Sequence, residues 1–336
     1  MVTKVFLLSS FADPADDTHW ASPYHALHRA FSEHPSAECL LIDSAADADL
    51  ILICPRARNP VFPTEIFRGG LAWKYRHKCV VISTDDNPTM THKGFYTAKR
   101  ASATRSPWLK GGFYPLVAYS LPEAPFPLDA DFRHLFSFRG SFATHPVRRR
   151  IGALADAASP EEALRFLVVD TSRRTAGDGQ IFNRDYVASL RDSKFILCPR
   201  GMCPSSVRLF ETMKSGRVPV VISDEWAPPP EVPWKRFVIT IAEKDVAFIP
   251  RILAQEESGF MERARSAQQA WADYFCAQAL PETVTRWGMA LLDQARQETQ
   301  LLTHLTELWG QVFRWRFLRR GVLSQMRQIL TGAAAD

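Results

Sequence analysis

Short apolar runs, rich in β-branched residues and separated by helix-like stretches, restrict the fold of this chain more than any other feature. Early in the chain these runs are Val5–Leu8, Leu40–Ile42, Leu50–Cys54 and Cys79–Ser83. Each has the length of a buried strand. A helix-like stretch over Ser22–Ser32 lies between the first two. Strands that alternate with helices pair in parallel, because each crossover helix returns the chain to the end of the sheet at which the previous strand began.

A second series of the same kind follows a proline-rich segment, Leu121–Asp131, which is typical of a linker. The strands expected after it are Leu135–Phe138, Phe166–Val169, Phe195–Cys198, Val218–Ile222 and Phe237–Ile241. The expected helices are Pro146–Ala157, Tyr186–Leu190, Ser206–Ser215, Val246–Gln255 and Phe260–Phe275. The sequence therefore predicts an α/β protein with two Rossmann-like domains, over 1–130 and 131–280, that face a cleft. C-terminal helices over 281–336 complete the chain.

The composition excludes several classes of protein. Hydrophobic residues make up 46% and charged residues 23%, which excludes fibrous and disordered chains. No apolar run approaches the ~18–20 residues that cross a bilayer. The six cysteines form no Cys-x-x-Cys pair, and most adjoin apolar runs. We therefore expect reduced, structural cysteines and a cytoplasmic protein.

The formal net charge of +5 comes from one segment. Residues 308–330 contain no Asp or Glu and five arginines: Arg314, Arg316, Arg319, Arg320 and Arg327. The other 41 − 5 = 36 basic residues balance the 36 acidic ones. Because nucleic-acid binders usually spread a basic face over the folded body, we expect no nucleic-acid partner.

The residues best suited to binding a ligand lie where the predicted strand Phe195–Cys198 is followed by a Pro/Gly loop and a helix. Ser205 or Ser206 is placed to cap that helix, since a serine hydroxyl accepts a hydrogen bond from a backbone N–H. Free N–H groups and the helix dipole attract anions to such an end. Arg200 and Arg208 flank the turn and suit bidentate contact with a phosphate.

Glu211 lies three residues after Arg208, hence on nearly the same helix face. A carboxylate there suits the hydroxyls of a ribose, and we expect this face to be open to the cleft. A surface ion pair of little energetic weight is the alternative. The loop matches neither Gly-x-x-x-x-Gly-Lys-Ser/Thr nor Gly-x-Gly-x-x-Gly. The residues alone thus favour a nucleotide-diphosphate pocket and leave the ion pair open.

The same stretch resembles the exostosin-type glycosyltransferases. The family's Phe-x-Leu-x-Pro-x-Gly strand-loop occurs as Phe195–Gly201, and its Ser-x-Arg-x-x-Glu helix as Ser206–Glu211. Its Gly-x-Val-Pro-Val strand occurs as Gly216–Val220 within Gly216–Ile222. Phe138-Arg139-Gly140, followed by Arg148, is also similar. The likeness covers residues 135–255.

This resemblance implies a two-domain GT-B architecture and an inverting transfer without a bound metal. It places the nucleotide-sugar in the C-terminal domain and the acceptor against the N-terminal one. The implied donor-binding residues are Arg139, Arg148, Arg200, Gly201, Ser205, Ser206, Arg208 and Glu211. The family often has a basic residue after the loop glycine, but here it is Met202. We expect no cofactor, and a UDP-sugar rather than a GDP-sugar as co-substrate.

An inverting transfer needs a general base for the acceptor hydroxyl. Asp85 and Asp86 directly follow the strand Cys79–Ser83, at the edge where parallel sheets present catalytic loops. A second group follows the first strand in the same way: Asp13, Asp16, Asp17 and His19. For both groups, a helix cap or a solvated loop position is the alternative.

Two Asp-x-Asp strings, at 47–49 and 129–131, invite a metal interpretation. The first runs straight into a predicted strand and the second lies in the predicted linker. We therefore expect no metal site.

The basic C-terminal segment 305–330 has apolar residues at helical spacing. They are Leu305, Leu308, Val312, Trp315, Leu318, Val322, Met326 and Ile329. A basic amphipathic helix of this kind suits an anionic membrane surface, here the inner face of the plasma membrane. A closing helix packed on the protein is the alternative, and Gly310 and Gly321 weaken a continuous helix.

The resemblance thus implies a hexosyl- or pentosyltransferase that builds a surface polysaccharide or glycolipid, and the basic C-terminal segment predicts a peripheral membrane protein. The alternative is an inactive, membrane-associated glycosyltransferase-like scaffold or glycan-binding protein. Nucleic-acid binding through the tail would instead show a steep loss of affinity with salt.

A chain truncated after residue 304 is expected to lose co-sedimentation with anionic liposomes. Each basic residue near an anionic surface contributes about 1 kcal/mol, and the truncation removes all five of the segment's arginines. Liposomes of neutral lipid are the control. Unchanged co-sedimentation would contradict the membrane hypothesis.

Overall fold

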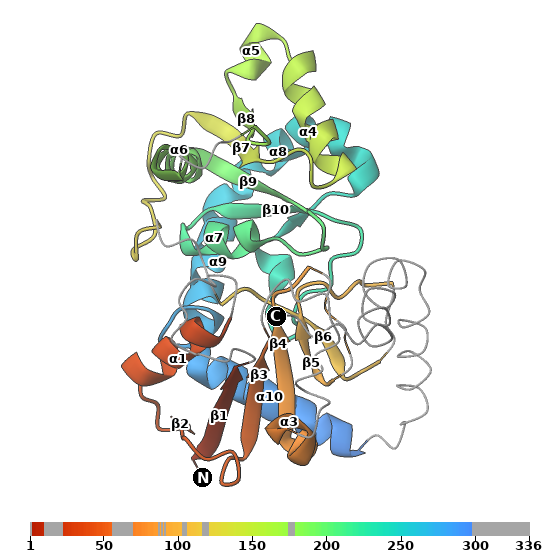
Figure 1. Ribbon diagram of the computed structural model, residues 1–336. Helices are drawn as coiled ribbons and strands as arrows, with labels where there is room; N and C mark the ends of the chain where they lie inside the picture. Colours follow the sequence, from red (N-terminus) through yellow and green to blue (C-terminus); the bar gives the residue numbers. More distant parts are fainter. Residues whose placement is uncertain are drawn as a thin grey trace, which may run out of the picture. The chain divides into compact units, whose positions relative to one another are not determined.

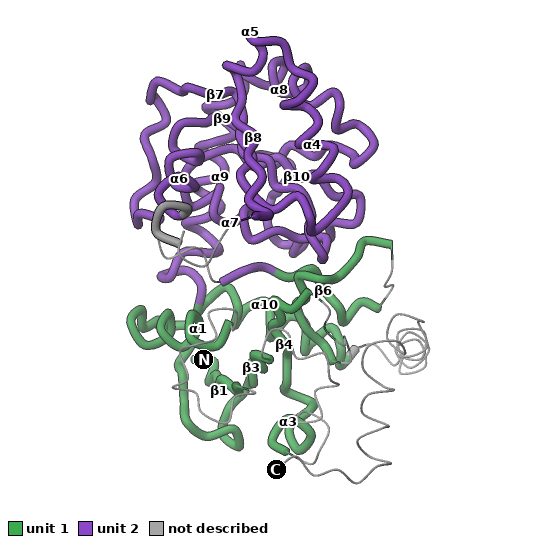
Figure 2. The backbone as a smooth tube through the Cα atoms, turned by 45° about the horizontal axis from the view of Figure 1, so that its top comes forward, with its two compact units in different colours: residues 1–112, 281–336 green, residues 113–280 purple. Residues whose placement is uncertain are grey.

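The computed structural model describes residues 2–9, 23–55, 70–86, 88, 90, 92–102, 106–115, 121–173 and 179–297, with the backbone alone at 179–182 and 297. The chain forms two compact units (Figure 2): residues 1–112 with 281–336, and residues 113–280. Each unit contains one parallel sheet with helices packed against it (Figure 1). The predicted α/β class with two Rossmann-like domains is confirmed.

The first boundary between the units follows Gly112 rather than residue 130. The aromatic ring of Phe113 lies 6.0 Å from that of Phe275, which belongs to unit 2. Further along, the backbone N–H of Phe126 donates to the carbonyl of Ser215 at 3.2 Å. The second contact attaches the proline-rich segment, predicted as a linker, to unit 2.

Unit 1 has the strands β1 (Thr3–Ser9), β2 (Cys39–Leu41), β3 (Leu50–Cys54), β4 (Cys79–Ser83), β5 (Gly94–Tyr96) and β6 (Leu109–Gly111). Their order is β2-β1-β3-β4-β5-β6, and every pairing is parallel. Its helices include α1 (Pro23–Glu33), α3 (Leu71–Lys74) and η1 (Arg76–Lys78). All residues of β3 and β4 are buried, as parallel strands covered on both faces require.

Helix α10 (Leu280–Gln297) returns the chain to unit 1. The ring of Trp287 lies 5.8 Å from that of Phe95. A Cβ added at Gly288 would lie 2.8 Å from Leu50, so the helix approaches the sheet closely at this point. The described residues of the predicted C-terminal part therefore pack on the first sheet.

Unit 2 has the strands β7 (His134–Gly140), β8 (Phe166–Asp170), β9 (Ser193–Pro199), β10 (Val218–Ile222) and β11 (Ile239–Thr240). Its α-helices are α4 (Pro146–Ala157), α5 (Pro160–Ala163), α6 (Gly179–Arg191), α7 (Val207–Lys214), α8 (Ile249–Glu256) and α9 (Phe260–Tyr274). The 3-10 helices are η3 (Trp234–Arg236), η4 (Glu243–Phe248) and η5 (Glu257–Gly259). Phe136, Phe138 and Phe195 are fully buried in its core.

The strand order of unit 2 is β11-β10-β9-β7-β8. Counted within each unit, both sheets follow the doubly wound order 2-1-3-4-5, and unit 1 adds a sixth strand. In each unit the second strand lies on one side of the first strand, and the third strand lies on its other side. The switch point is therefore between β7 and β9 in unit 2 and between β1 and β3 in unit 1. In such sheets ligands bind outside the carboxyl ends of the strands at this point.

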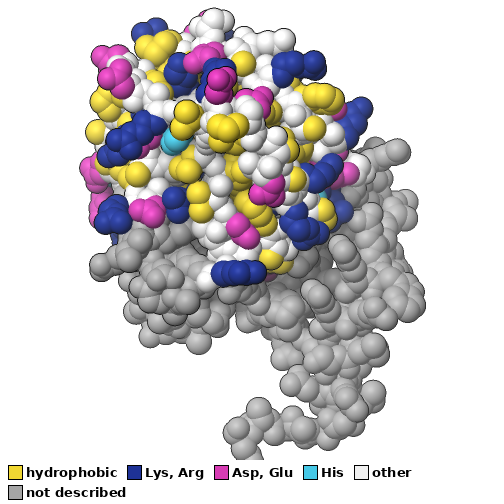
Figure 3. Space-filling view, turned by 90° about the horizontal axis from the view of Figure 1, so that it is seen from above, with side chains coloured by type: hydrophobic (Ala, Val, Ile, Leu, Met, Phe, Trp, Pro, Cys, Tyr) yellow, Lys and Arg dark blue, Asp and Glu magenta, His cyan; other side chains and the backbone are white. Residues whose placement is uncertain are grey.

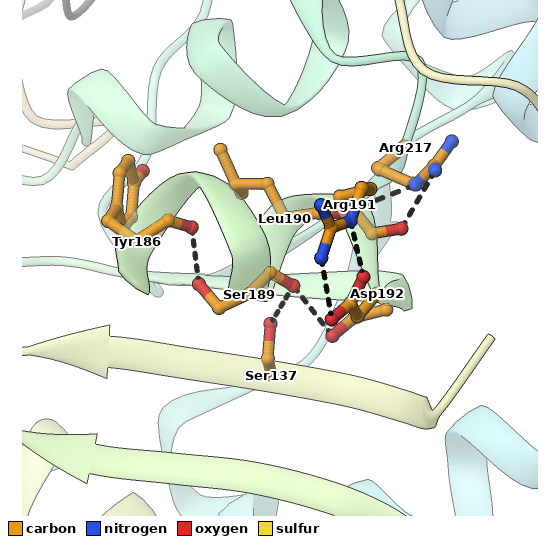
Figure 4. Close-up of polar contacts among 8 residues, drawn as sticks. Ser137, Tyr186, Ser189, Leu190, Arg191, Asp192 and Arg217 are labelled. Carbon is orange, nitrogen blue, oxygen red and sulfur yellow. Dashed lines mark hydrogen bonds and ion pairs between the residues drawn. The ribbon is translucent and has the colours of Figure 1, made fainter. Parts of the chain in front are cut away.

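A buried arginine, Arg217, lies at the amino-terminal ends of the unit 2 strands (Figure 4). Its Nε donates to the carbonyl of Leu190 at 3.2 Å and its Nη2 to that of Arg191 at 2.9 Å, which caps the end of α6. Its Nη1 reaches the carbonyl of Phe126 at 3.4 Å. Burial lowers the pKa of Arg217 to about 10. Just before it, Gly216 ends α7 with a φ of 70°, as its place after the predicted helix suggests.

The face of unit 2 seen from above carries mixed charges (Figure 3). Lys and Arg side chains are interspersed there with Asp, Glu and apolar side chains. Segment 305–330 lies outside the described residues, so its contact with a membrane stays a prediction. Within the described ranges, no helix is long and apolar enough to cross a membrane.

The substitution Arg217→Met is expected to destabilise the protein by about 2–4 kcal/mol, because it leaves the buried carbonyls at the end of α6 without donors. Urea unfolding measures the change. Arg191→Met is the matched control, since the Arg191 side chain is 55% exposed and pairs only with its neighbour Asp192 in the described structure. Equal stability of the two variants would contradict this role for Arg217.

Candidate functional site

Arginines from four different elements meet at the switch point of unit 2. Nη2 of Arg208, in α7, donates to the carbonyl of Arg139, at the end of β7, at 2.7 Å. Nε of Arg148, in α4, donates to the carbonyl of Arg200, directly after β9, at 2.9 Å. The structure thus brings together the four arginines predicted from the sequence, at the edge where the topology places a ligand.

Arg208 is held on aromatic rings. Its guanidinium carbon lies 4.7 Å from the centre of the Phe138 ring and 5.6 Å from that of the Tyr186 ring. Such cation–π contacts favour one orientation of a guanidinium. A Cβ added at Gly140 would lie only 2.8 Å from Nη2 of Arg208. The glycine therefore leaves the space that this guanidinium occupies.

Arg148 clamps the loop after β9. Its guanidinium donates to three backbone carbonyls: Nε to Arg200, Nη2 to Pro199 at 3.2 Å, and Nη1 to Ser141 at 3.3 Å. A Cβ added at Gly201 would lie 3.1 Å from Nη2 of Arg148, so this loop glycine permits the close approach. The geometry gives Arg148 the role of holding the loop, and direct contact between Arg148 and a donor stays a prediction.

Arg200 lies at the base of the site and is 7% exposed. Its Nη1 stands 3.6 Å from a carboxylate oxygen of Glu243. Glu243 is in turn tied to Asp224 after β10 by two hydrogen bonds of 3.2 and 2.9 Å. The pair therefore joins the loops after β9 and β10 and partly neutralises Arg200.

Several buried side-chain groups of this cluster that can donate a hydrogen bond have no partner in the described part of the chain. They are Nε of Arg139, Nε of Arg200, Nε of Arg208 and Oγ of Ser205. Buried polar groups in native proteins are almost always satisfied, by protein, water or ligand. Three N–H groups of cationic side chains and one hydroxyl are suited to the oxygens of a phosphate.

Ser206 is the N-cap residue of α7, as predicted, but its side chain makes no capping hydrogen bond. The first N–H groups of the helix therefore receive no acceptor from that hydroxyl. Backbone N–H groups at the start of a helix attract anions. This end of α7 adds to the positive potential of the arginine cluster.

Glu211 does not lie on an open face, contrary to the expectation from its spacing. It is 5% exposed, within an α7 stretch whose residues 209–213 are all buried. Its Oε2 accepts a hydrogen bond from the hydroxyl of Tyr186 in α6. Burial, followed by the Glu211 carboxylate, raises the pKa of Tyr186 well above its ordinary value. Sequence spacing could not show this partner, because α6 meets α7 only in the folded unit.

The candidate general bases lie in unit 1. Asp85 and Asp86 follow β4 and are half-buried, and the backbone N–H of Asp85 donates to the Ser83 hydroxyl at 3.3 Å. The strand β4 is next to β3, one strand beyond the switch point of this sheet. The other candidates, Asp13, Asp16, Asp17 and His19, lie outside the described residues. The identity of the base stays a prediction.

One of the two Asp-x-Asp strings has a structural role. A carboxylate oxygen of Asp49 accepts the backbone N–H of Lys4 at 2.8 Å, directly before β3. Among the residues that the structure describes, no group of three or more His, Cys, Asp or Glu side chains could hold a metal ion.

Comparison with known proteins gives the following similarities. The Caenorhabditis elegans Exostosin-1 homolog is 41% identical over 83 residues, which are 24% of this chain and 22% of that protein. The Arabidopsis thaliana probable beta-1,4-xylosyltransferase IRX10 is 37% identical over 70 residues, 20% of this chain and 17% of that protein. The chain therefore aligns with only about a fifth of the length of these curated relatives.

Among solved structures, the lipopolysaccharide outer core galactosyltransferase WaaB in its apo form is similar with a TM-score of 0.45. It is 10% identical, and the match covers 88% of this chain and 100% of that one. The Exostosin GT47 domain matches residues 125–255, which include the whole arginine cluster with Tyr186 and Glu211. Residues 125–255 therefore match the exostosin GT47 domain, the family that the sequence motifs resemble.

Proposed function

We propose that this protein is a glycosyltransferase that moves a sugar from a UDP-sugar to a glycan or glycolipid acceptor, with inversion at the anomeric carbon. The observation that carries the proposal is the set of buried, unpartnered donors on Arg139, Arg200, Arg208 and Ser205 at the switch point of unit 2. The GT47 family match supports the reaction class.

The cluster suits a diphosphate because its positive charge exceeds its paired negative charge. The cluster has four arginines and three nearby carboxylates. Asp185 lies 3.7 Å from Arg139, and Glu243 lies 3.6 Å from Arg200. The third, Glu211, accepts a hydrogen bond from Tyr186, whose ring contacts Arg208. Arg208 and Arg148 donate to neutral carbonyls instead. A bound diphosphate would supply the missing negative charge.

Catalysis would depend on hydrogen-bond donors of the protein whose positions are fixed before the reaction begins. When the sugar's anomeric C–O bond breaks, the bonding electrons pass to the diphosphate, whose charge increases. Guanidinium groups already oriented by rings and carbonyls stabilise that charge without reorganising. Tyr186 supports this arrangement twice, since its ring lies under Arg208 and its hydroxyl donates to Glu211.

The acceptor hydroxyl attacks the anomeric carbon from the face opposite the diphosphate and gives its proton to a general base. Asp85 and Asp86 are our candidates for that base. The relatives' names include a xylosyltransferase and glucuronosyltransferases, so a pentose and a hexuronic acid belong among the donors to be tested. We further propose that segment 305–330 brings the protein to the inner face of the plasma membrane.

The substitution Gly140→Ala is expected to weaken UDP-sugar binding by at least about tenfold, which corresponds to ~1.4 kcal/mol. The added methyl group would displace the guanidinium of Arg208. Gly259→Ala is the matched control, because a Cβ there meets nothing closer than 4.0 Å. Calorimetry with UDP-glucose, UDP-xylose and UDP-glucuronic acid measures binding, and circular dichroism checks the fold.

Equal affinities of the two alanine variants would count against a donor site beside Gly140. Transfer to lysate glycolipids, and hydrolysis of the bound donor, are measured with the same samples. Donor binding without either reaction would favour the alternative of an inactive scaffold.

A further inference from the structure

A basic and aromatic surface of unit 1 has no role in the proposed function. It lies at the amino-terminal end of β4, on the two short helices α3 and η1 that precede this strand (Figure 1). We call it the α3 patch, and its exposed members are Leu71, Trp73, Lys74, Arg76 and His77. The candidate base Asp85 follows β4 at the other end of the same strand. A partner bound to the α3 patch therefore leaves the carboxyl end of β4 free.

The helix α3 contacts the sheet through its smallest residue. Ala72 is buried, whereas its neighbours Leu71 and Trp73 are 43% and 48% exposed. The thiol of Cys79, the first residue of β4, donates to the carbonyl of Ala72 at 3.7 Å and to that of Tyr75 at 3.2 Å. Successive residues of an α-helix are about 100° apart, so a helix that turns Ala72 inward turns Leu71 and Trp73 outward.

The ring of Trp73 forms one surface with a cation. The guanidinium carbon of Arg76 lies 5.1 Å from the centre of this ring, and Nη1 of Arg76 donates to the carbonyl of Trp73 at 3.3 Å. A half-exposed indole leaves much apolar area in water, which is unfavourable until something covers it. An indole suits the boundary between water and acyl chains, because it has an apolar body and a polar N–H.

Positive charge exceeds negative charge around the α3 patch. Residues 66–84 contain four Lys or Arg and no Asp or Glu. Directly before β5, Lys93 adds a cation, and its Nζ donates to the carbonyl of Arg76 at 3.2 Å.

Three carboxylates offset part of this charge. Asp293 of α10 pairs with Arg296 at 3.2 Å. Asp47 and Asp49 lie in the turn before β3, whose carbonyls at 46 and 48 accept from Nζ of Lys78. The exposed cations Lys74 and Arg76 form no ion pair in the described structure, so they are available to an anionic partner.

We propose that the α3 patch is a second membrane-contact surface, which places Leu71 and Trp73 in the interfacial region of an anionic bilayer. Lys74 and Arg76 would then lie at the level of the lipid phosphates. A soluble polyanion fits less well, because it would leave the two apolar side chains in water. The inference goes beyond the proposed function, since it requires neither donor binding nor sugar transfer.

The α3 patch would act together with segment 305–330. Near the end of α10, Arg296 is close enough to Lys93 to add to the lowering of its pKa, which burial causes in the main. The helix ends at Gln297, and the basic segment begins eight residues later in the sequence. Two linked contacts with one membrane raise the overall affinity above that of either contact. Loss of the patch alone is therefore expected to weaken binding by the full chain.

The test measures binding of the full chain to vesicles of phosphatidylcholine and phosphatidylglycerol in equal amounts, and to vesicles of phosphatidylcholine alone. The double substitution Lys74→Gln and Arg76→Gln is expected to weaken binding to the anionic vesicles by at least about tenfold at low salt. Lys235→Gln with Arg236→Gln is the matched control. It removes two exposed charges from η3 of unit 2, where the adjacent tryptophan is buried, and should bind as wild type does.

The substitution Trp73→Ala tests the apolar contact and is expected to weaken binding several-fold. Phe248→Ala is its control, because Phe248 is also 48% exposed and the guanidinium carbon of Arg251 lies 5.1 Å from its ring centre. Trp73→Leu keeps an apolar side chain but removes the indole. Lipids with brominated acyl chains quench tryptophan emission on contact, so they should quench a smaller part of the emission in Trp73→Leu than in wild type.

Each outcome decides a different point. Losses in the charge variant and in Trp73→Ala, without losses in the two controls, support the inference. Wild-type binding by the charge variant, or unchanged quenching in Trp73→Leu, overturns it and leaves the proposed function standing. Weaker binding of the charge variant to dextran sulfate, with no effect of Trp73→Ala on vesicles, indicates a polyanion site and also overturns it.

UDP-sugar binding by the same variants separates the inference from the proposed function. Every patch variant should bind a UDP-sugar as wild type does, which also checks that it folds. The absence of UDP-sugar binding and transfer by the wild type overturns the proposed function but not the membrane contact. If Trp73→Ala does not fold, the charge variant and the quenching of Trp73→Leu decide.

Discussion

Arginine side chains donate hydrogen bonds to backbone carbonyls at both ends of the unit 2 strands and hold the neighbouring helices and loops in place. Carbonyls fix a guanidinium in place but carry no full negative charge, so the cation remains uncompensated. At the amino-terminal edge, Arg217 is fully buried over the ring of Phe132, and the negative end of the α6 dipole accepts its charge. At the carboxyl-terminal edge, Arg148 and Arg208 lie where ligands of such sheets bind. The same kind of contact thus builds a structural anchor at one end of the strands and, on the proposed function, a diphosphate site at the other.

The sequence predicts the sheets well because burial on both faces leaves a continuous apolar run. β4, β10 and α4 have the predicted bounds, Cys79–Ser83, Val218–Ile222 and Pro146–Ala157. β5 and β6 were not predicted, because each has three residues and includes a glycine. Strands this short form only because a neighbouring strand already offers hydrogen bonds, which no local pattern records.

Some features of the site follow from the local sequence, whereas others depend on contacts between residues far apart in the chain. The motif around Arg200 and Arg208 lies within one strand–loop–helix segment, so the sequence alone identifies these residues. The orientation of Glu211 depends on Tyr186, 25 residues away, and the clamp of Arg148 depends on carbonyls 51 and 52 residues away. These contacts join separate elements, and neither spacing nor periodicity predicts them.

The two units share one strand order, but the charged residues that follow their strands differ in sign. The arginine cluster follows β7 and β9 in unit 2, whereas Asp85 and Asp86 follow β4 in unit 1. Carboxylates placed near this cluster pair with it, as Asp185 does with Arg139. A base within the cluster would therefore lose proton affinity, since a neighbouring cation lowers the pKa of a carboxyl group. On the proposed function, the general base is therefore to be sought among carboxylates outside the arginine cluster.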